Sequence, residues 1–189
     1  KGTIYHEKGI DVASLKSIKE IHHKSLEEYA VLHPDAVYTP VSKYPDKGHA
    51  VWHIPCDVAF PSATQNELTL VDAQKLVENG CILVNEGANM PTTSDAIAYL
   101  RKHNVLFAPG KAANSGGVAT SQLEMSQNAS MLNWTFEEVD IQLRTIMQNV
   151  FKTVYDTSKE FDCEGDLVKG ANIAGFRKVA DSMIDQGSV

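Results

Sequence analysis

The sequence predicts an α/β fold in which a parallel sheet comes first and helices follow it. Between residues 57 and 110, short apolar runs alternate with amphipathic stretches, which is the pattern of βαβ units. Strands joined by single helices lie parallel, so we expect a parallel sheet that is covered on both faces. After residue 110 the apolar period is helical only, which predicts that the rest of the chain is α-helical.

Composition and charge exclude several classes of protein. The chain has 189 residues, of which 43% are hydrophobic and 22% are charged, as in an ordinary single-domain globule. Its net charge is −7 and its lysines are scattered, which argues against a nucleic-acid partner. No apolar run approaches the roughly 20 residues of a membrane span, so we expect no membrane partner. The opening residues, KGTIYHEKGID, contain neither a signal-peptide pattern nor an initiator methionine, so we expect further residues before them.

The cysteines and histidines predict neither a disulfide framework nor a metal site. Cys56, Cys81 and Cys163 are odd in number and lack CxxC spacing, which favours a reducing, cytoplasmic setting. His22 and His23 are adjacent on a predicted helix and point to different faces, whereas ligands on a helix stand three or four residues apart. We therefore expect no bound metal.

The N-terminal third predicts one helix and one loop. Residues 11–31 repeat apolar side chains at about helical spacing, with Asp11 as the N-cap residue. Residues 33–50 contain three prolines and show no period, which predicts a loop.

The alternating region predicts three strands and two helices. Thr69 and Asp72 have the spacing of a capping box, and Gly80 suits the end of the helix that they begin. In chain order, the expected elements are a strand at 57–61, a helix at 69–79, a strand at 81–88, a helix at 93–103 and a strand at 105–110.

The C-terminal part predicts three helices. Thr135 and Glu138 form a second capping-box pattern at the start of the middle one. Gly170 and Gly175 each cost about 1 kcal/mol relative to alanine inside a helix, so they indicate either close packing or a break in the last one. These helices are expected at 117–131, 135–161 and 166–187.

Three polar loops follow the three predicted strands. In an open parallel sheet the ligand lies outside the carboxyl ends of the strands. Each loop is rich in small residues and carries a side-chain amide, which leaves space for a ligand and offers donors and acceptors. One such loop is more commonly an ordinary turn, but three in succession favour a ligand cleft. The loops are residues 61–67, 86–93 and 109–117.

Individual side chains in these loops allow two interpretations. Glu67 and Glu86 are either catalytic acids or bases, or carboxylates that favour the positive end of a helix dipole. Lys111 either binds an anion or is solvated. Ser121 has no GxSxG around it, so we expect it to form hydrogen bonds rather than act as a nucleophile. The chain has no GxGxxG turn for a dinucleotide phosphate.

Four motifs resemble those of a known family: ATQNEL, NEGANMPTT, LFAPGKAANSGGVATSQLEMSQN and GANIAGFRKVADSM. Together they resemble the C-terminal portion of a hexameric glutamate dehydrogenase, over about residues 50–189. The resemblance implies a partial Rossmann-like parallel sheet followed by C-terminal helices. It also implies that residues 1–110 are the latter part of the dinucleotide-binding domain, and that residues 111–189 return toward the substrate domain.

The same resemblance implies an activity, which is the reversible NAD(P)-dependent oxidative deamination of L-glutamate to 2-oxoglutarate and ammonia by a homo-hexamer. The motifs are closer to the NADP-linked class, with NAD as the alternative. Two other readings are an amino-acid dehydrogenase of leucine or phenylalanine type and a non-catalytic nucleotide-binding module. The family's catalytic lysines and aspartate belong to segments that this sequence lacks, so we expect no catalytic residue here and an inactive isolated chain.

The resemblance also assigns binding roles. Ser121 would bond the side-chain carboxylate of the substrate, and Gly116 and Gly117 would let the backbone approach both ligands because they have no Cβ. The cofactor residues would be Ala63, Thr64, Gln65, Asn89 and Asn114. The substrate residues would be Asn114, Val118 and Ser121.

Overall fold

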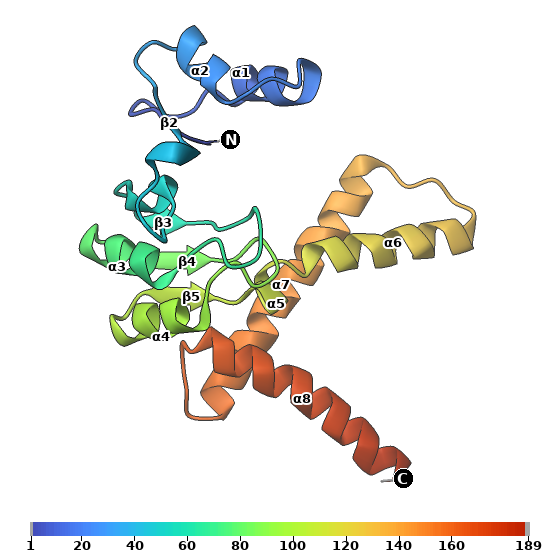
Figure 1. The fold of residues 1–189 in the computed structure, drawn as a ribbon. Coiled ribbons are helices and arrows are strands. Elements are labelled where there is room, and N and C mark those ends of the chain that lie inside the picture. The colour runs from blue at the N-terminus through green and yellow to red at the C-terminus, as the bar shows by residue number, and fades with distance from the viewer. Residues whose placement is uncertain (1, 188–189) are drawn as a thin grey trace.

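The computed structural model describes residues 2–187 and confirms the α/β class, with a three-stranded parallel sheet and long helices after it (Figure 1). A small N-terminal lobe lies beyond the β3 edge of the sheet, and the long C-terminal helices extend away from the side of the sheet where the strands end. No helix within residues 2–187 is long and apolar enough to cross a membrane.

The N-terminal lobe contains a two-stranded antiparallel sheet that the sequence did not predict. Strand β1 (Gly2–Tyr5) pairs with β2 (Val37–Pro40), so that Tyr5 lies opposite Val37. The expectation that residues 33–50 form only a loop is therefore wrong. These strands are short and their pairing joins distant segments, so neither shows a clear period of its own. The lobe has its own small core of Ile18, Tyr29 and Ala36.

The single helix expected at 11–31 is interrupted. Helix α1 (Val12–Lys16) continues into a π-helical turn at Ser17–Ile21, and α2 (Glu27–Leu32) begins only after a gap. His23 adopts a φ of 51°, a left-handed conformation that a right-handed helix cannot contain. The predicted cap is confirmed, because the Asp11 carboxylate accepts the N–H of Ala13 at 3.0 Å.

The central sheet has the order β3-β4-β5 with all strands parallel, as predicted. Between the strands lie two helices, and the capping box of Thr69 and Asp72 begins the first of them. Gly80, at φ 80°, follows its last turn. The elements are β3 (Val58–Ala59), α3 (Leu70–Glu78), β4 (Leu83–Asn85), α4 (Ser94–Lys102) and β5 (Leu106–Ala108).

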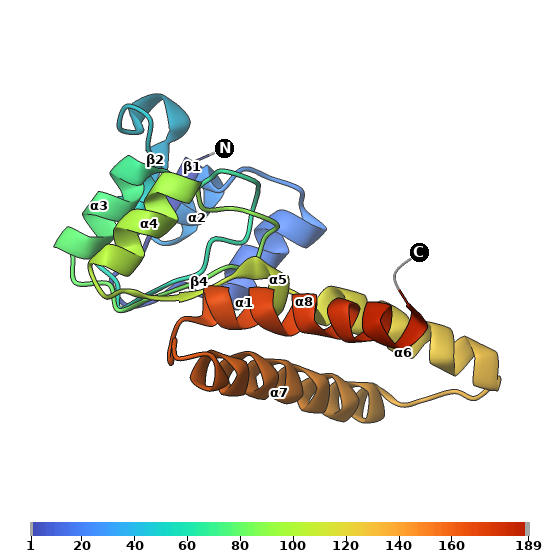
Figure 2. The ribbon, with the colours of Figure 1, turned by 90° about the horizontal axis from the view of Figure 1, so that it is seen from below.

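The sheet is not covered on both faces within residues 2–187, so that expectation is wrong. Helices α3 and α4 lie together on one face (Figure 2) and pack against the buried side chains of Ala59, Val84 and Phe107. Leu106 points to the opposite face and is 58% exposed. A right-handed crossover places consecutive helices on the same face, so the other face needs covering from outside the βαβ units.

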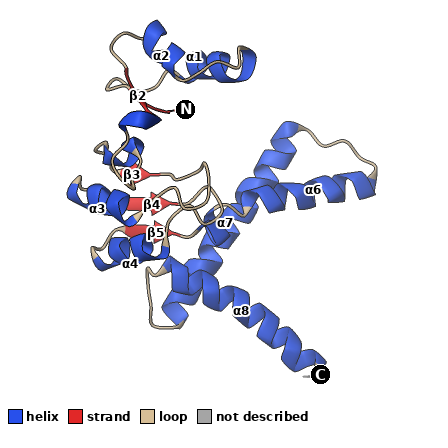
Figure 3. Cartoon of the chain, viewed as in Figure 1, coloured by secondary structure: helices blue, strands red, loops and turns tan. Residues whose placement is uncertain are grey.

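The C-terminal region is helical, as Figure 3 shows. The capping box of Thr135 and Glu138 is confirmed, and the last helix runs without a break through both of its internal glycines. A Cβ on Gly170 would overlap the carbonyl of Val154, so this glycine marks close packing between helices. The helices are α5 (Gly110–Ala113), which was not predicted, α6 (Gly116–Ser130), α7 (Phe136–Glu160) and α8 (Leu167–Gln186).

Candidate functional site

The loops that follow β3 and β4 are joined by backbone hydrogen bonds at the carboxyl end of the sheet. The N–H groups of Gly87 and Ala88 both donate to the carbonyl of Pro61, at 2.9 and 3.1 Å. Further along, Leu68 N–H donates to the carbonyl of Pro91 at 2.9 Å. These bonds place two polar segments side by side that lie more than twenty residues apart in the sequence.

The third loop, after β5, is attached to the second through side chains. The Asn114 amide nitrogen donates to Asn89 Oδ1 at 2.7 Å and to the carbonyl of Ala88 at 2.9 Å. At the start of the same turn, Gly110 N–H donates to the Glu86 carboxylate at 2.6 Å. All three loops therefore form one connected structure.

Together the loops and the start of α6 line an open cleft with a volume of about 620 Å³. This volume lies within the range of small-molecule sites. The structure brings all seven sequence-predicted binding residues into this cleft, while their separate roles stay predictions. The lining residues are Ser62, Ala63, Thr64, Gln65, Gly87, Ala88, Asn89, Asn114, Gly117, Val118 and Ser121.

The first turns of α6 present two different side chains to the cleft. Val118 is 67% exposed, so its methyl groups are open to a ligand in the cleft. Ser121 is also exposed, and its hydroxyl has no hydrogen-bond partner within residues 2–187. By contrast, Thr120 and Ser126 on the same helix donate to carbonyls four residues earlier. The hydroxyl of Ser121 is thus available for a ligand.

Two glycines that sequence reasoning did not select allow the loops to meet. A Cβ on Gly87 would overlap the side chain of Ser62, and one on Gly110 would lie 2.8 Å from the carbonyl of Ala88. By contrast, a Cβ on Gly117 would meet nothing within 4 Å, so the described chain leaves open space there. The only sequence feature that could have identified Gly87 and Gly110 is that each is a glycine close to the end of a predicted strand.

The two buried glutamates brace loops and do not line the cleft. Glu67 accepts the N–H of Ala63 at 2.9 Å, and Glu86 accepts those of Gly110 at 2.6 Å and Thr92 at 3.3 Å. Both carboxylates are therefore occupied by backbone donors from the predicted binding loops. The structure thus assigns both carboxylates a bracing contact that neither the acid–base nor the helix-dipole interpretation included.

Lys111 is turned away from the cleft as well. Its ammonium group donates to the side-chain carbonyl of Asn172 on α8. Lys111 thus links the β5 turn to the last helix, while its side chain stays exposed to solvent.

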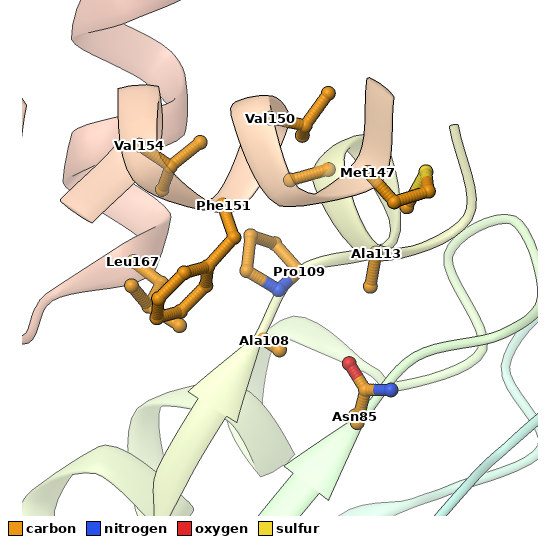
Figure 4. Close-up of a pocket in the computed structure, with 10 residues that line it drawn as sticks. Asn85, Ala108, Pro109, Ala113, Met147, Val150, Phe151, Val154 and Leu167 are labelled. Carbon is orange, nitrogen blue, oxygen red and sulfur yellow. The ribbon is translucent and has the colours of Figure 1, made fainter. Parts of the chain in front are cut away.

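A second cavity lies behind the β5 turn, between the carboxyl ends of β4 and β5 and the side of α7 (Figure 4). Its volume is about 100 Å³. The Asn85 amide points toward it, while the rest of its wall is apolar: Ala108, Pro109, Ala112, Ala113, Met147, Val150, Phe151, Val154 and Leu167. This cavity is far too small for a dinucleotide.

The chain is similar to known glutamate dehydrogenases. The NADP-specific glutamate dehydrogenase of Helicobacter pylori is 53% identical over 186 residues, which cover 98% of this chain and 42% of that protein. The corresponding enzyme of Escherichia coli is 50% identical over 143 residues, which cover 76% of this chain and 32% of that protein.

The fold has a close counterpart among solved structures. The crystal structure of Plasmodium falciparum glutamate dehydrogenase superposes with a TM-score of 0.89 at 44% sequence identity, covering 100% of this chain and 40% of that one. The chain spans about two fifths of the length of the Helicobacter and Plasmodium relatives. The family model of glutamate/leucine/phenylalanine/valine dehydrogenases matches residues 1–187, and the chain therefore belongs to this family.

Proposed function

We propose that this chain is the C-terminal part of an NADP-dependent glutamate dehydrogenase. The complete enzyme would carry out the reversible oxidative deamination of L-glutamate to 2-oxoglutarate and ammonia. The observation that carries the proposal is the convergence of three strand-end loops on one polar cleft lined by seven predicted binding residues. Several of the similar proteins are NADP-specific glutamate dehydrogenases, which supports the same interpretation.

The donors and acceptors of the cleft fit the nicotinamide end of a cofactor. Because Asn114 directs its amide nitrogen to Asn89 and to the carbonyl of Ala88, its own oxygen is left to accept. Asn89 receives that bond on its oxygen, so its amide nitrogen is left to donate. This pairing suits ribose hydroxyls and a carboxamide, which both donate and accept. NADP, when bound, supplies the hydride acceptor, and NAD is the alternative cofactor.

The first turns of α6 fit glutamate better than an aliphatic amino acid. The unpartnered hydroxyl of Ser121 would donate to the side-chain carboxylate of the substrate, and Val118 would contact its methylene groups. Leucine and phenylalanine offer nothing at that position to accept a hydrogen bond. This favours glutamate over the leucine and phenylalanine alternative, and no observation favours a non-catalytic module.

We further propose that residues 1–110 are the latter part of the dinucleotide-binding domain and that residues 111–189 return toward a substrate domain. Exposed apolar side chains along α8 support the second part, because such a stripe is normally covered by other protein. They are Phe176, Val179, Met183 and Ile184. The complete enzyme would be a homo-hexamer in the cytoplasm, where the three free cysteines of this chain would stay reduced.

The test is an assay of the complete polypeptide beside the 189-residue chain. We expect the complete protein to reduce NADP⁺ in the presence of glutamate, and the 189-residue chain to show no turnover, because it lacks the groups that hold the reactants in register. Leucine and phenylalanine are tested in place of glutamate, and NAD⁺ is tested in place of NADP⁺. Turnover of leucine without glutamate, or no turnover with any amino acid, would contradict the proposal.

A further inference from the structure

Glu86 begins the loop that carries Asn89 and contacts the turn that leads to Asn114. It follows β4 directly and is only 5% exposed. One carboxylate oxygen accepts the N–H of Gly110 from the turn after β5, and the other accepts the N–H of Thr92 from the end of its own loop. The carboxylate therefore bridges two segments of backbone.

Burying the Glu86 carboxylate carries a desolvation cost that an apolar side chain of the same size would not have. No ion pair within residues 2–187 involves Glu86, so its charge is balanced by the backbone donors alone. Burying a charge without such partners is strongly unfavourable. An apolar side chain would fill the same volume without that penalty, but it would leave the N–H groups of Gly110 and Thr92 without acceptors. The carboxylate thus holds these two backbone segments in place through hydrogen bonds, which an apolar side chain could not form.

The position of Asn114 depends on the turn that Glu86 holds. Gly110 begins the four-residue helix α5, and its carbonyl accepts the N–H of Asn114 at 2.8 Å. At the far end, the Asn114 side chain is bonded to Ala88 and Asn89. The β5 turn is therefore attached to the β4 loop at two places, and the Glu86 carboxylate is the first of them.

We propose that Glu86 is a positioning residue, which sets the separation of Asn89 and Asn114 and through them the placement of cofactor against substrate. This inference rests on the proposed function of the cleft. Glu86 does not line the cleft itself but lines a neighbouring cavity that it shares with Asn89, so its influence on the cleft would pass through the two asparagines.

The first test is Glu86→Gln in the complete enzyme. The amide keeps the size of the side chain but sets an NH₂ group against one of the two backbone donors, so one bond is lost. We expect kcat/KM for glutamate to fall at least tenfold, because a displacement of about 1 Å at a reacting pair is worth roughly a hundredfold.

The matched control is Asp72→Asn. Asp72 is also fully buried and accepts two backbone N–H groups, from His49 at 2.7 Å and Thr69 at 3.0 Å, but none of these residues lines the cleft. We expect both variants to lower Tm and only Glu86→Gln to lower kcat/KM. Equal loss of kcat/KM in both variants, or kcat/KM of Glu86→Gln within twofold of wild type, would overturn the proposal.

A second variant and a hydrogen-exchange measurement test the positioning role if the first experiment fails. If Glu86→Gln does not fold, Glu86→Asp retains the charge but is one methylene shorter, and wild-type kcat/KM for it would overturn the proposal. If the wild-type enzyme has no dehydrogenase activity, the proposed function fails, and hydrogen exchange then tests the brace. Glu86→Gln or Glu86→Asp should speed exchange of the Gly110 and Asn114 amides, and Asp72→Asn should leave both unchanged. Unchanged exchange at Asn114 in the Glu86 variant would refute the positioning role.

Discussion

The amide nitrogen of Asn114 lies 2.7 Å from Oδ1 of Asn89 and donates a hydrogen bond to it across the carboxyl end of the sheet. The same nitrogen also donates to the carbonyl of Ala88. One side chain at the start of the helical region is thus bound to the β4 loop by both of its N–H groups. This relationship fixes which atom of each asparagine is left for a ligand.

Replacing Asn114 with Asp should disrupt this arrangement. A carboxylate offers no donor, so it would face two oxygen acceptors, at Asn89 and Ala88, with like partial charge. Leaving such groups unpaired costs about 1 to 3 kcal/mol. We expect a weaker affinity for NADP, measured by fluorescence titration of the complete enzyme. Asn128→Asp, at an exposed position of α6, is the control and should bind as wild type. An unchanged affinity in Asn114→Asp would remove the residue from the cofactor site.

Ser121→Ala should act on the amino acid and not on the cofactor. A hydrogen bond to a charged group is worth about 1.5 to 3 kcal/mol, so KM for glutamate and 2-oxoglutarate should rise by roughly tenfold to a hundredfold. Ser126→Ala is the control, because that hydroxyl donates to the carbonyl of Gln122 within the helix. If kcat/KM for glutamate stays within twofold, or if cofactor affinity falls equally, the assignment of Ser121 to the substrate carboxylate is wrong.

The two glycines within α8 should respond to alanine with opposite signs. A Cβ on Gly170 would overlap the backbone of Val154, and overpacking of this kind costs about 1 to 3 kcal/mol. A Cβ on Gly175 would meet nothing within 4 Å, so alanine should stabilise the helix by up to about 1 kcal/mol. Urea unfolding of each variant measures both effects. A stabilising Gly170→Ala would contradict the close contact between α7 and α8.

Acid should weaken the N-terminal lobe through Asp35. Lys8, at 2.8 Å, and His6, at 3.3 Å, hold the pKa of this carboxylate well below its usual range. A lowered folded-state pKa stabilises the protein above the ordinary value of about 3.9, and this contribution disappears as pH falls from there toward the lowered pKa. The effect should be small and sensitive to salt, because the side chain is half exposed.

Asp35→Asn cannot ionise, so it should be less stable than wild type at pH 7, and the difference should shrink at pH 3. Urea unfolding at both pH values measures this. Asp46→Asn is the control, because Asp46 is exposed and has no ion pair within residues 2–187. A difference between Asp35→Asn and wild type that stays constant across this pH range would contradict the ion pair.

Much of the fold was predictable because its signals are local. Thr69 and Asp72, and likewise Thr135 and Glu138, begin helices through bonds that span three residues, so the pattern alone locates each start. Alternation of apolar runs with helices predicted the parallel sheet for the same reason. The seven cleft residues were predictable in a weaker sense, because strand-end loops of a parallel sheet meet at one edge and the motifs resemble a known family.

Other features depend on contacts between distant residues, and no local pattern reports these. The pairing of β1 with β2, which turned a predicted loop into a strand, joins residues more than thirty positions apart. The break of the first helix depends on a left-handed φ at His23. Histidine does not favour this conformation strongly enough for the sequence to predict it. Glu86 could be identified as a candidate from its place after a strand, but its role could not, since its partners come from two other loop positions. The sequence by itself therefore determined where helices begin and which loops share an edge. Only the tertiary structure decided which side chains bond across those loops, because that depends on how the chain returns to the same point in space.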